Sequence, residues 1–169
     1  MTKSVKFLGV TASIALLAAC GGGESEPAAD TAATAPAATT AAAPEPAAEA
    51  PAVDNTETLD GTTLAEFTPD VAHGGEVFAQ CQTCHVLEEG VNRVGPSLAG
   101  IVGRAAGTVE GYTYSDANKN SGITWTKEKL FQYLEKPQRV IPGTKMAFAG
   151  LPAGQDRADV IAYLESGGQ

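Results

Sequence analysis

The pentapeptide Cys81-Gln82-Thr83-Cys84-His85 decides how this chain folds. In a helical turn its two thiols and its imidazole fall at i, i+3 and i+4, and therefore on one face. Both thiols can then form thioethers with the two vinyl groups of one haem while the adjacent imidazole meets the iron. C-x-x-C-H is the attachment signature of c-type haem. The spacing therefore predicts one covalently bound haem c on Cys81 and Cys84, with His85 as an iron ligand.

Three alternative uses of the two cysteines fit the surrounding sequence less well. A redox-active pair of the thioredoxin kind follows a strand, whereas Cys81 follows an expected helix and no βαβ periodicity surrounds it. A zinc site would need His73 as a further ligand, which gives no usual zinc spacing. A structural disulfide between Cys81 and Cys84 is the third alternative. We expect His73 to be a solvated surface residue.

The second iron ligand is nearly identified by elimination. After removal of a signal peptide, the chain keeps one other histidine, His73, and one methionine, Met146. His73 lies near the start of the helix that leads to His85, and so on the same side of the haem. Met146 follows Pro142-Gly143, which excludes a helix and constrains the loop. Packing as a core gap-filler is the alternative role for this methionine. Ligation by His85 and Met146 would stabilise reduced iron, as suits an electron carrier.

Hydrophobic spacing predicts three helices in the folded part, over 70–80, 127–136 and 156–165. We expect Thr68 to cap the first and Thr126 the second, which Pro137 ends. No strand alternation stands out. The sequence therefore predicts an all-α domain, in which three to five helices wrap around one haem that supplies much of the core.

The N-terminus, MTKSVKFLGVTASIALLAAC, has the pattern of an export signal, because two lysines precede an apolar stretch too short to span a bilayer. Its last four residues resemble a bacterial lipobox, in which the cysteine is acylated and becomes the mature N-terminus. We expect a signal peptide over 1–19 and a lipid anchor on Cys20, which places the protein on the periplasmic side of a bacterial cell envelope. An ordinary signal peptide with a chance cysteine is the alternative. In many Gram-negative lipoproteins an aspartate directly after the lipidated cysteine signals retention in the inner membrane. Because Gly21 stands at that position, sorting to the outer membrane is possible.

The segment 20–66 is expected to be a disordered tether, followed by the folded domain over 67–169. It is rich in Ala, Pro, Thr and Glu, and residues 21–70 hold ten acidic and no basic side chains. Such a segment cannot bury enough apolar surface to offset the entropy of ordering. A glycosylated or wall-crossing stalk is the alternative interpretation. The whole chain carries a formal charge of −9 and no basic run, which argues against nucleic acid as a partner.

From about residue 69 to 166 the sequence resembles class I cytochrome c of the mitochondrial and purple-bacterial type. The resemblance rests on the segments CQTCH, GPSLAGIVGR, GYTYSDANKNSGITW, YLEKP, IPGTKMAFAG and RADVIAYL. It implies the class I fold, one covalent haem c, and His85 and Met146 as axial ligands. It covers nearly the whole expected domain and none of the first 60 residues.

The resemblance also implies roles for further side chains. Pro96 would lie against His85 and orient its imidazole. The residues expected to bond or neutralise the haem propionates are Arg104, Tyr114 and Trp125. The residues expected to form a polar network near the methionine are Asn118, Tyr133 and Thr144. The first and last helices are expected to cross at Gly74, Phe78, Val160 and Tyr163.

The function that the resemblance implies is transfer of single electrons by a monomeric carrier, which the expected lipid anchor on Cys20 would tether to a membrane. The implied partners are a quinol–cytochrome c oxidoreductase and a haem–copper oxidase or a photosynthetic reaction centre. A small haem enzyme of the peroxidase or reductase type is one alternative. A gas sensor in which Met146 dissociates from the iron is another.

The sequence departs from the mitochondrial pattern in its lysines. Gln80 precedes the first cysteine, and Pro152-Ala153-Gly154 stands where the family often has lysines. The cations left near the expected haem edge are Arg93, Lys136, Arg139 and Lys145. We therefore expect weaker electrostatic steering, which a tether that raises local concentration could offset.

Overall fold

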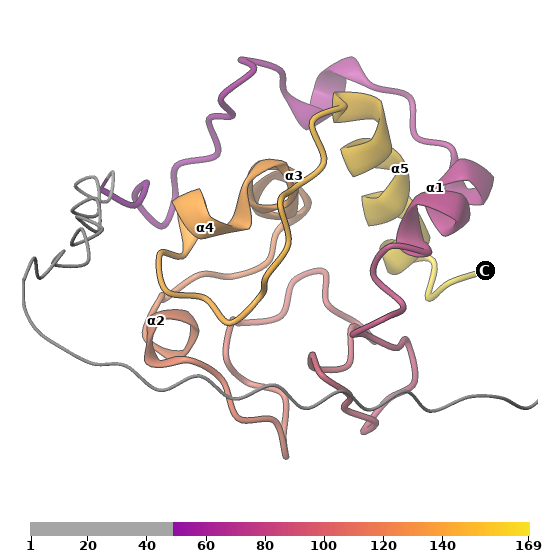
Figure 1. Ribbon diagram of the computed structural model, residues 1–169. Coiled ribbons are helices and arrows are strands. Elements are labelled where there is room, and N and C mark those ends of the chain that lie inside the picture. The colour runs from indigo at the N-terminus through magenta and orange to yellow at the C-terminus, as the bar shows by residue number, and fades with distance from the viewer. Residues whose placement is uncertain (1–48) are drawn as a thin grey trace, which may run out of the picture. The chain divides into compact units, whose positions relative to one another are not determined.

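The computed structural model describes residues 49–169, so the predicted signal peptide, Cys20 and most of the expected tether lie outside the described residues. The described part is helical (Figure 1), with η1 (Leu64–Glu66), α1 (Val71–Phe78), α2 (Asp116–Lys119), α3 (Lys127–Glu135), α4 (Pro137–Val140) and α5 (Gly154–Glu165). Within 49–169 the β-type pairing is a single isolated bridge, between Ala105 and Thr124. The predicted all-α class is therefore confirmed. Among these helices, none combines the length and the apolar character needed to span a membrane.

The helix ends follow from capping side chains. Thr126 accepts a hydrogen bond from the amide of Lys129 at the start of α3, as predicted, and α3 ends before Pro137. Helix α1 differs from the prediction, because its N-cap is Asp70 and not Thr68. The Asp70 carboxylate accepts from the amides of Ala72 and His73, and its own amide donates to Asp159 on α5 at 2.7 Å. The tertiary contact with α5 thus fixes the start of α1.

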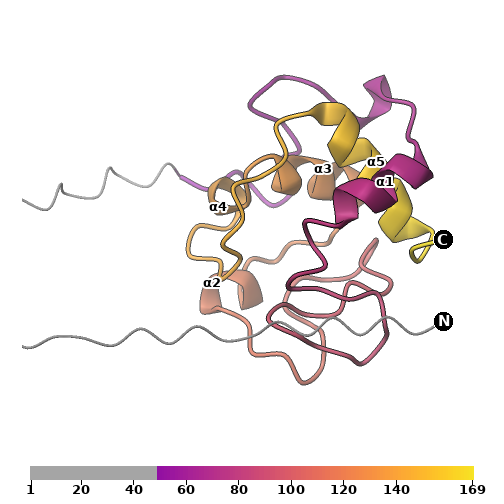
Figure 2. The ribbon, with the colours of Figure 1, turned by 45° about the vertical axis from the view of Figure 1, so that its right-hand side comes forward.

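Helices α1 and α5 lie side by side in both ribbon views (Figures 1 and 2) and cross at the residues expected. A side chain at Gly74 would overlap the backbone carbonyl of Asp159, so glycine permits the close approach. Next to it the rings of Phe78 and Tyr163 lie 5.3 Å apart. This pair and α3 supply most of the buried apolar residues. The stretch 79–126 adds Ile101, Ile123 and Trp125, together with α2 and the loops that close the other side.

Residues 51–66 correct the prediction that the tether extends to residue 66. In the structure this segment, which we name the strap, runs across α3 and α5 at the top of Figure 1. Its partners are buried polar side chains, since Lys129 Nζ donates to the carbonyl of Asn55 at 2.7 Å and Arg157 Nη2 lies 2.6 Å from the Asp60 carboxylate. Composition concealed these bonds, because most of the acceptors are backbone carbonyls. The folded domain therefore includes residues 51–66 and does not begin at Phe67.

Candidate haem-binding site

A cavity of about 450 Å³ lies between α3, α5 and the loops on either side of α2. The eleven cofactor-binding residues predicted from the sequence all line it. They are Cys81, Cys84, His85, Pro96, Arg104, Tyr114, Asn118, Trp125, Tyr133, Thr144 and Met146. Another hollow, of about 520 Å³, lies beside Pro51 and α2, and none of these eleven residues lines it. The structure thus brings the whole predicted set to one place.

The segment after α1 continues in helical turns and sets the spacing of the attachment residues. The amide of Cys84 donates to the carbonyl of Cys81 at 3.0 Å, and the amide of His85 donates to the same carbonyl at 2.9 Å. Both cysteines are free thiols, so they do not form the alternative disulfide in this structure. Burial, with a smaller contribution from neighbouring Cys84, raises the pKa of the Cys81 thiol to about 11. Redox-active pairs have lowered thiol pKa values, so the site suits thioether attachment better.

His85 is oriented by the loop around Pro96, as expected. Its Nδ1 donates to the Pro96 carbonyl at 2.8 Å, which leaves Nε2 as the nitrogen available to a metal. Burial lowers the pKa of the imidazole and outweighs the opposite effect of the Pro96 bond, so the ring is kept neutral. A side chain at Gly95 would overlap the ring, and the glycine is therefore part of the cradle.

Met146 is held at the cavity by polar contacts on its sulfur and its backbone. The Tyr133 hydroxyl donates to Sδ over 3.4 Å, and Thr144 Oγ1 accepts from the Met146 amide at 3.2 Å. The side chain of Gln138 donates to the Met146 carbonyl at 3.0 Å. Burial raises the pKa of Tyr133, so its hydroxyl stays a donor. Two of the three predicted network residues therefore contact Met146 directly.

The third network residue, Asn118, supplies a test of fit. Its Oδ1 is buried at the cavity wall and has no hydrogen-bond partner among residues 49–169. A buried polar atom without a partner is rare in a native fold and indicates that a ligand or water completes the site. A lining of mainly apolar surface, two thiols, an imidazole and a thioether matches the ligands that hold haem c. The residues present therefore fit this group.

The predicted propionate residues line the cavity, but the structure gives them partners of their own. Arg104 donates to the carbonyls of Ala99 at 2.7 Å and Ser97 at 2.9 Å. The indole of Trp125 packs on the ring of Tyr133, with centroids 4.7 Å apart. Burial lowers the pKa of Arg104, which favours an acidic partner for it, and burial raises that of Tyr114.

Sequence reasoning missed several cavity residues. Tyr112 packs edge-on against Tyr114, with ring centroids 4.7 Å apart, and its hydroxyl donates to the carbonyl of Val94. Further lining residues that the sequence did not mark as cofactor-binding include Leu98, Ser115 and Phe148. Tyr112 stands two positions before Tyr114, within the segment GYTYSDANKNSGITW that carries the resemblance, so it could have been predicted at the site. The others carry no spacing that marks them.

His73 takes no part in the cavity. Its Nδ1 lies 2.8 Å from the buried carboxylate of Asp159, while its side chain stays 43% exposed. His73 therefore lies at the surface, as expected, and in addition pairs with Asp159 of α5. Among residues 49–169 no three His, Cys, Asp or Glu side chains are grouped to hold a metal ion, which argues against the zinc alternative.

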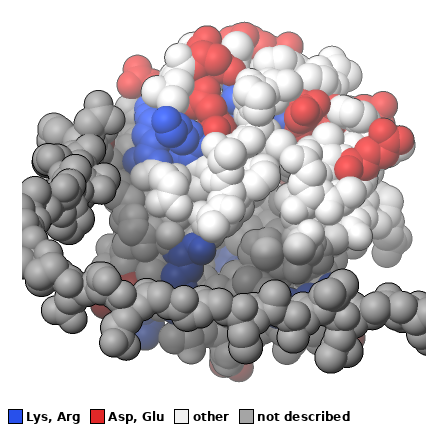
Figure 3. Space-filling view, viewed as in Figure 1, with Lys and Arg blue, Asp and Glu red and all other residues white. Residues whose placement is uncertain are grey.

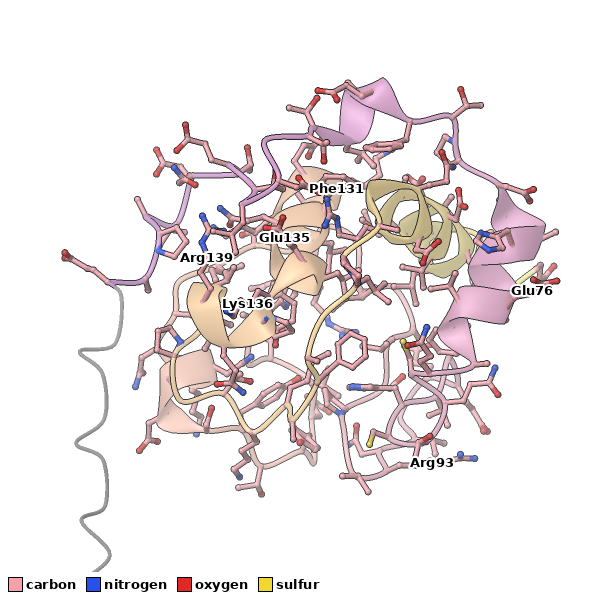
Figure 4. The ribbon with its side chains drawn as sticks, turned by 45° about the horizontal axis from the view of Figure 1, so that its top comes forward. Glu76, Arg93, Phe131, Glu135, Lys136 and Arg139 are labelled. Atoms are coloured by element: carbon pink, nitrogen blue, oxygen red, sulfur yellow. The ribbon has the colours of Figure 1, made fainter. Side chains whose placement is uncertain are left out.

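The four cations expected near the haem edge do not form a ring. Arg139 is 21% exposed and lies 3.9 Å from Glu135, and it also donates to a strap carbonyl. Figure 4 shows Lys136 beside Arg139, while Arg93 lies on another side of the molecule. In Figure 3 acidic side chains lie along the top and the right of this face. The strap adds four carboxylates, those of Asp54, Glu57, Asp60 and Glu66. The positive charge available for docking is therefore sparse.

Comparisons with known proteins agree with this geometry. A family model described as Cytochrome c matches residues 71–168. Cytochrome c 2.1 of Caenorhabditis elegans is 52% identical over 97 residues, which are 57% of this chain and 87% of that protein. Cytochrome c2 of Blastochloris viridis is 54% identical over 97 residues, which are 57% of this chain and 76% of that protein. Among solved structures, cytochrome cH from Methylobacterium extorquens matches with a TM-score of 0.55 and 46% identity, over 57% of this chain and 98% of that one.

Proposed function

Because the chain belongs to the cytochrome c family, whose members carry electrons on a covalently bound haem c, we propose that it is a membrane-tethered electron carrier with His85 and Met146 as iron ligands. The family assignment makes it a carrier and not an enzyme, which sets aside the peroxidase and reductase alternatives. The gas sensor remains the rival, because it differs only in what Met146 does.

One observation carries the proposal. The attachment thiols, the oriented imidazole of His85 and the thioether of Met146 line one cavity. When bound, haem c supplies a one-electron Fe(III)/Fe(II) couple, and thioether ligation favours the reduced state. The chain's part is to hold Nε2 of His85 free and neutral, and to hold Met146 Sδ with the Tyr133 hydroxyl at 3.4 Å. A methionine fixed in this way supports a carrier, whose ligands stay in place through each cycle.

The rim of the cavity supports docking that depends little on charge. Val94, which lines the cavity, is 75% exposed, and the neighbouring lining residues Gln80 and Thr83 are uncharged. The amine of Lys145 donates to the carbonyl of Thr113, so that cation is partly engaged. A rim with so few charges fits a partner surface that is itself largely uncharged around its electron entry point.

Attachment to a membrane would supply the encounters that sparse charge does not. We expect a signal peptide over 1–19, a lipid anchor on Cys20 and a periplasmic position in a bacterial envelope. The expected tether would be shorter by the length of the strap, and a flexible chain of about 30 residues would have an r.m.s. reach of roughly 30 Å. The domain would meet membrane neighbours at raised effective concentration. The proposed donor is a quinol–cytochrome c oxidoreductase, and the proposed acceptor is a haem–copper oxidase or a photosynthetic reaction centre.

The experiment compares wild type with Cys20→Ala in native membranes, with reduction by quinol and reoxidation followed optically across a salt series. Wild type should cycle by single electrons at a rate that changes little with salt. Cys20→Ala should leave the membrane fraction, stop incorporating labelled fatty acid and cycle at least about tenfold more slowly. A variant that stays in the membrane and cycles at the wild-type rate would contradict the anchor. A wild-type protein that neither accepts nor returns electrons would contradict the carrier.

A further inference from the structure

Helix α3 carries a buried polar stripe that the proposed function does not use. Lys129, Gln132 and Glu135 recur at three-residue intervals and so lie along one side of the helix. Their exposed fractions are 2%, 0% and 6%. Charged and amide side chains are seldom buried to this extent unless every polar atom is paired. The strap is what covers them.

The first half of the strap supplies acceptors for this stripe. Lys129 Nζ donates to the carbonyls of Ala52 at 3.2 Å and Asn55 at 2.7 Å. Gln132 Nε2 donates to Asn55 Oδ1 and to the carbonyl of Glu57, both at 2.8 Å. These bonds require particular strap residues at particular heights along α3, so the strap has a fixed register.

The second half of the strap is joined to Glu135 in the last turn of α3. The amides of Leu59 and Asp60 donate to the two oxygens of the Glu135 carboxylate at 2.7 and 3.0 Å. Arg157 from α5 lies 3.6 Å from the same carboxylate and 2.6 Å from that of Asp60. Phe67, just after η1, then packs on Phe131 with ring centroids 5.7 Å apart. One carboxylate thus ties the strap to α3 and α5.

From this junction the contacts continue into the Met146 loop. Arg139 on α4 lies 3.9 Å from Glu135, and its Nη2 donates to the strap carbonyl of Glu57 at 3.1 Å. The neighbouring α4 residue Gln138 donates to the Met146 carbonyl at 3.0 Å. Figure 4 shows Glu135 and Arg139 close together at the start of α4. Within α4, Arg139 thus bonds to the strap while the adjacent Gln138 bonds to Met146.

We propose that the strap, residues 51–66, is a positioning element for Met146, acting through Glu135, Arg139 and α4. The family model matches residues 71–168, so the strap lies outside the part of the chain that the family defines. The inference rests on the proposed function in one respect, the ligand role of Met146. The position of the loop itself can be measured without that assumption.

The test uses the full-length holoprotein with the double change Asn55→Ala/Asp60→Ala, which removes strap acceptors from Gln132 and Arg157. The control is Asp159→Asn, because Asp159 is buried in α5 and binds α1 without contacting the strap. Hydrogen exchange is measured at the amides of Thr144, Met146 and Leu151, which are bonded within or beside the loop. Imidazole binding to the oxidised protein is measured as the loss of the near-infrared thioether–Fe(III) band.

The double variant should lose at least about tenfold of its amide protection in this loop and bind imidazole about tenfold more tightly. Asp159→Asn should lower the thermal midpoint with the loop protection and the imidazole affinity unchanged. If the double variant does not fold, Asn55→Ala alone should show the same changes at smaller size. Equal changes in the variant and the control, or unchanged loop protection in a folded strap variant, would overturn the proposal. A wild type without the near-infrared band would contradict Met146 ligation, while the exchange data would still decide the role of the strap.

Discussion

The two faces of helix α3 are both buried, but they are held by different kinds of interaction. One face presents Leu130, Tyr133 and Leu134 to the cavity, where a large apolar group is expected to fill the space. The other presents Lys129 and Gln132 to the strap, where each polar atom has a named partner. When apolar packing is reduced, the loss in folding free energy is proportional to the apolar area that is no longer buried. Removing the partner of a buried charge instead costs the full desolvation free energy of that charge in a single step. The faces should therefore respond differently to small changes.

The largest effect is expected on the cavity face, from Cys81→Ala/Cys84→Ala. Without covalent haem the cavity of about 450 Å³ would be left unfilled. At about 24 cal/mol per Å³ an unfilled cavity of that size costs on the order of 10 kcal/mol, which is comparable to the whole stability of a domain. We expect no haem stain on a denaturing gel and no cooperative thermal transition by circular dichroism. Cys20→Ala is the matched cysteine control and should keep both, and a cooperative transition in the double variant would refute this view of the core.

The next largest effect is expected on the strap face, from Arg157→Ala. Arg157 is fully buried and joins Asp60 of the strap to the carbonyl of Leu151. Its removal leaves buried acceptors without a cation, so the free energy of unfolding should fall by about 3–5 kcal/mol in a denaturant titration. The control Lys127→Ala breaks an exposed pair with Glu165 and should change stability by less than about 1 kcal/mol. Equal losses in the two variants would mean that the strap adds no stability.

A smaller effect is expected from acid. Burial alone would raise the pKa of Asp60, but hydrogen bonds from Thr62 and Arg157 outweigh it and hold this pKa well below the usual 3.8. A lowered pKa contributes stability above pH 3.8 that is lost as the pH falls through the folded-state value. Wild type should therefore exceed Asp60→Asn by about 1–2 kcal/mol at pH 7, and the difference should shrink below about pH 4. Thermal midpoints across the pH series measure it, and a difference that does not depend on pH would contradict the assignment.

The smallest effect is expected where His73 pairs with Asp159 between α1 and α5, since neither residue lines the cavity or bonds to the strap. The hydrogen bond to Asp159 raises the pKa of His73 above 6.5. A raised pKa contributes stability that is complete below pH 6.5 and is lost as the pH rises through the folded-state value. The thermal midpoint of wild type should fall slightly between pH 6 and pH 8, and that of His73→Asn should not. Hydrogen-exchange protection of the Met146 loop should be the same at both pH values. A change in that protection would mean that the His73–Asp159 pair and the Met146 loop are not independent.

The cavity face could be predicted from the sequence because its residues stand in dense local patterns. Cys81, Cys84 and His85 lie within one pentapeptide, and Met146 is nearly identified by elimination. Leu130 and Leu134 follow helical spacing. The attachment motif and the helix spacing are complete within a few residues, whereas the other lining residues, such as Pro96 and Asn118, could be named only through the family resemblance.

The strap could not be predicted because its partners are far away in sequence. The polar side chains of Lys129 and Gln132 follow no pattern that marks them as buried, and their acceptors stand more than 70 positions earlier in an Ala- and Pro-rich segment. One local signal was present, since Thr63 and Glu66 form a capping box around η1. The cap of α1 was misplaced for a similar reason, because Asp70 is fixed by Asp159, which lies 89 positions later.

The near-infrared spectrum of the oxidised full-length protein tests the central claim most directly. We predict a thioether–Fe(III) charge-transfer band in wild type that is absent from Met146→Ala, with wild type binding carbon monoxide poorly when reduced. A wild-type protein that lacks the band and binds carbon monoxide readily would contradict Met146 ligation and favour the gas sensor over the electron carrier.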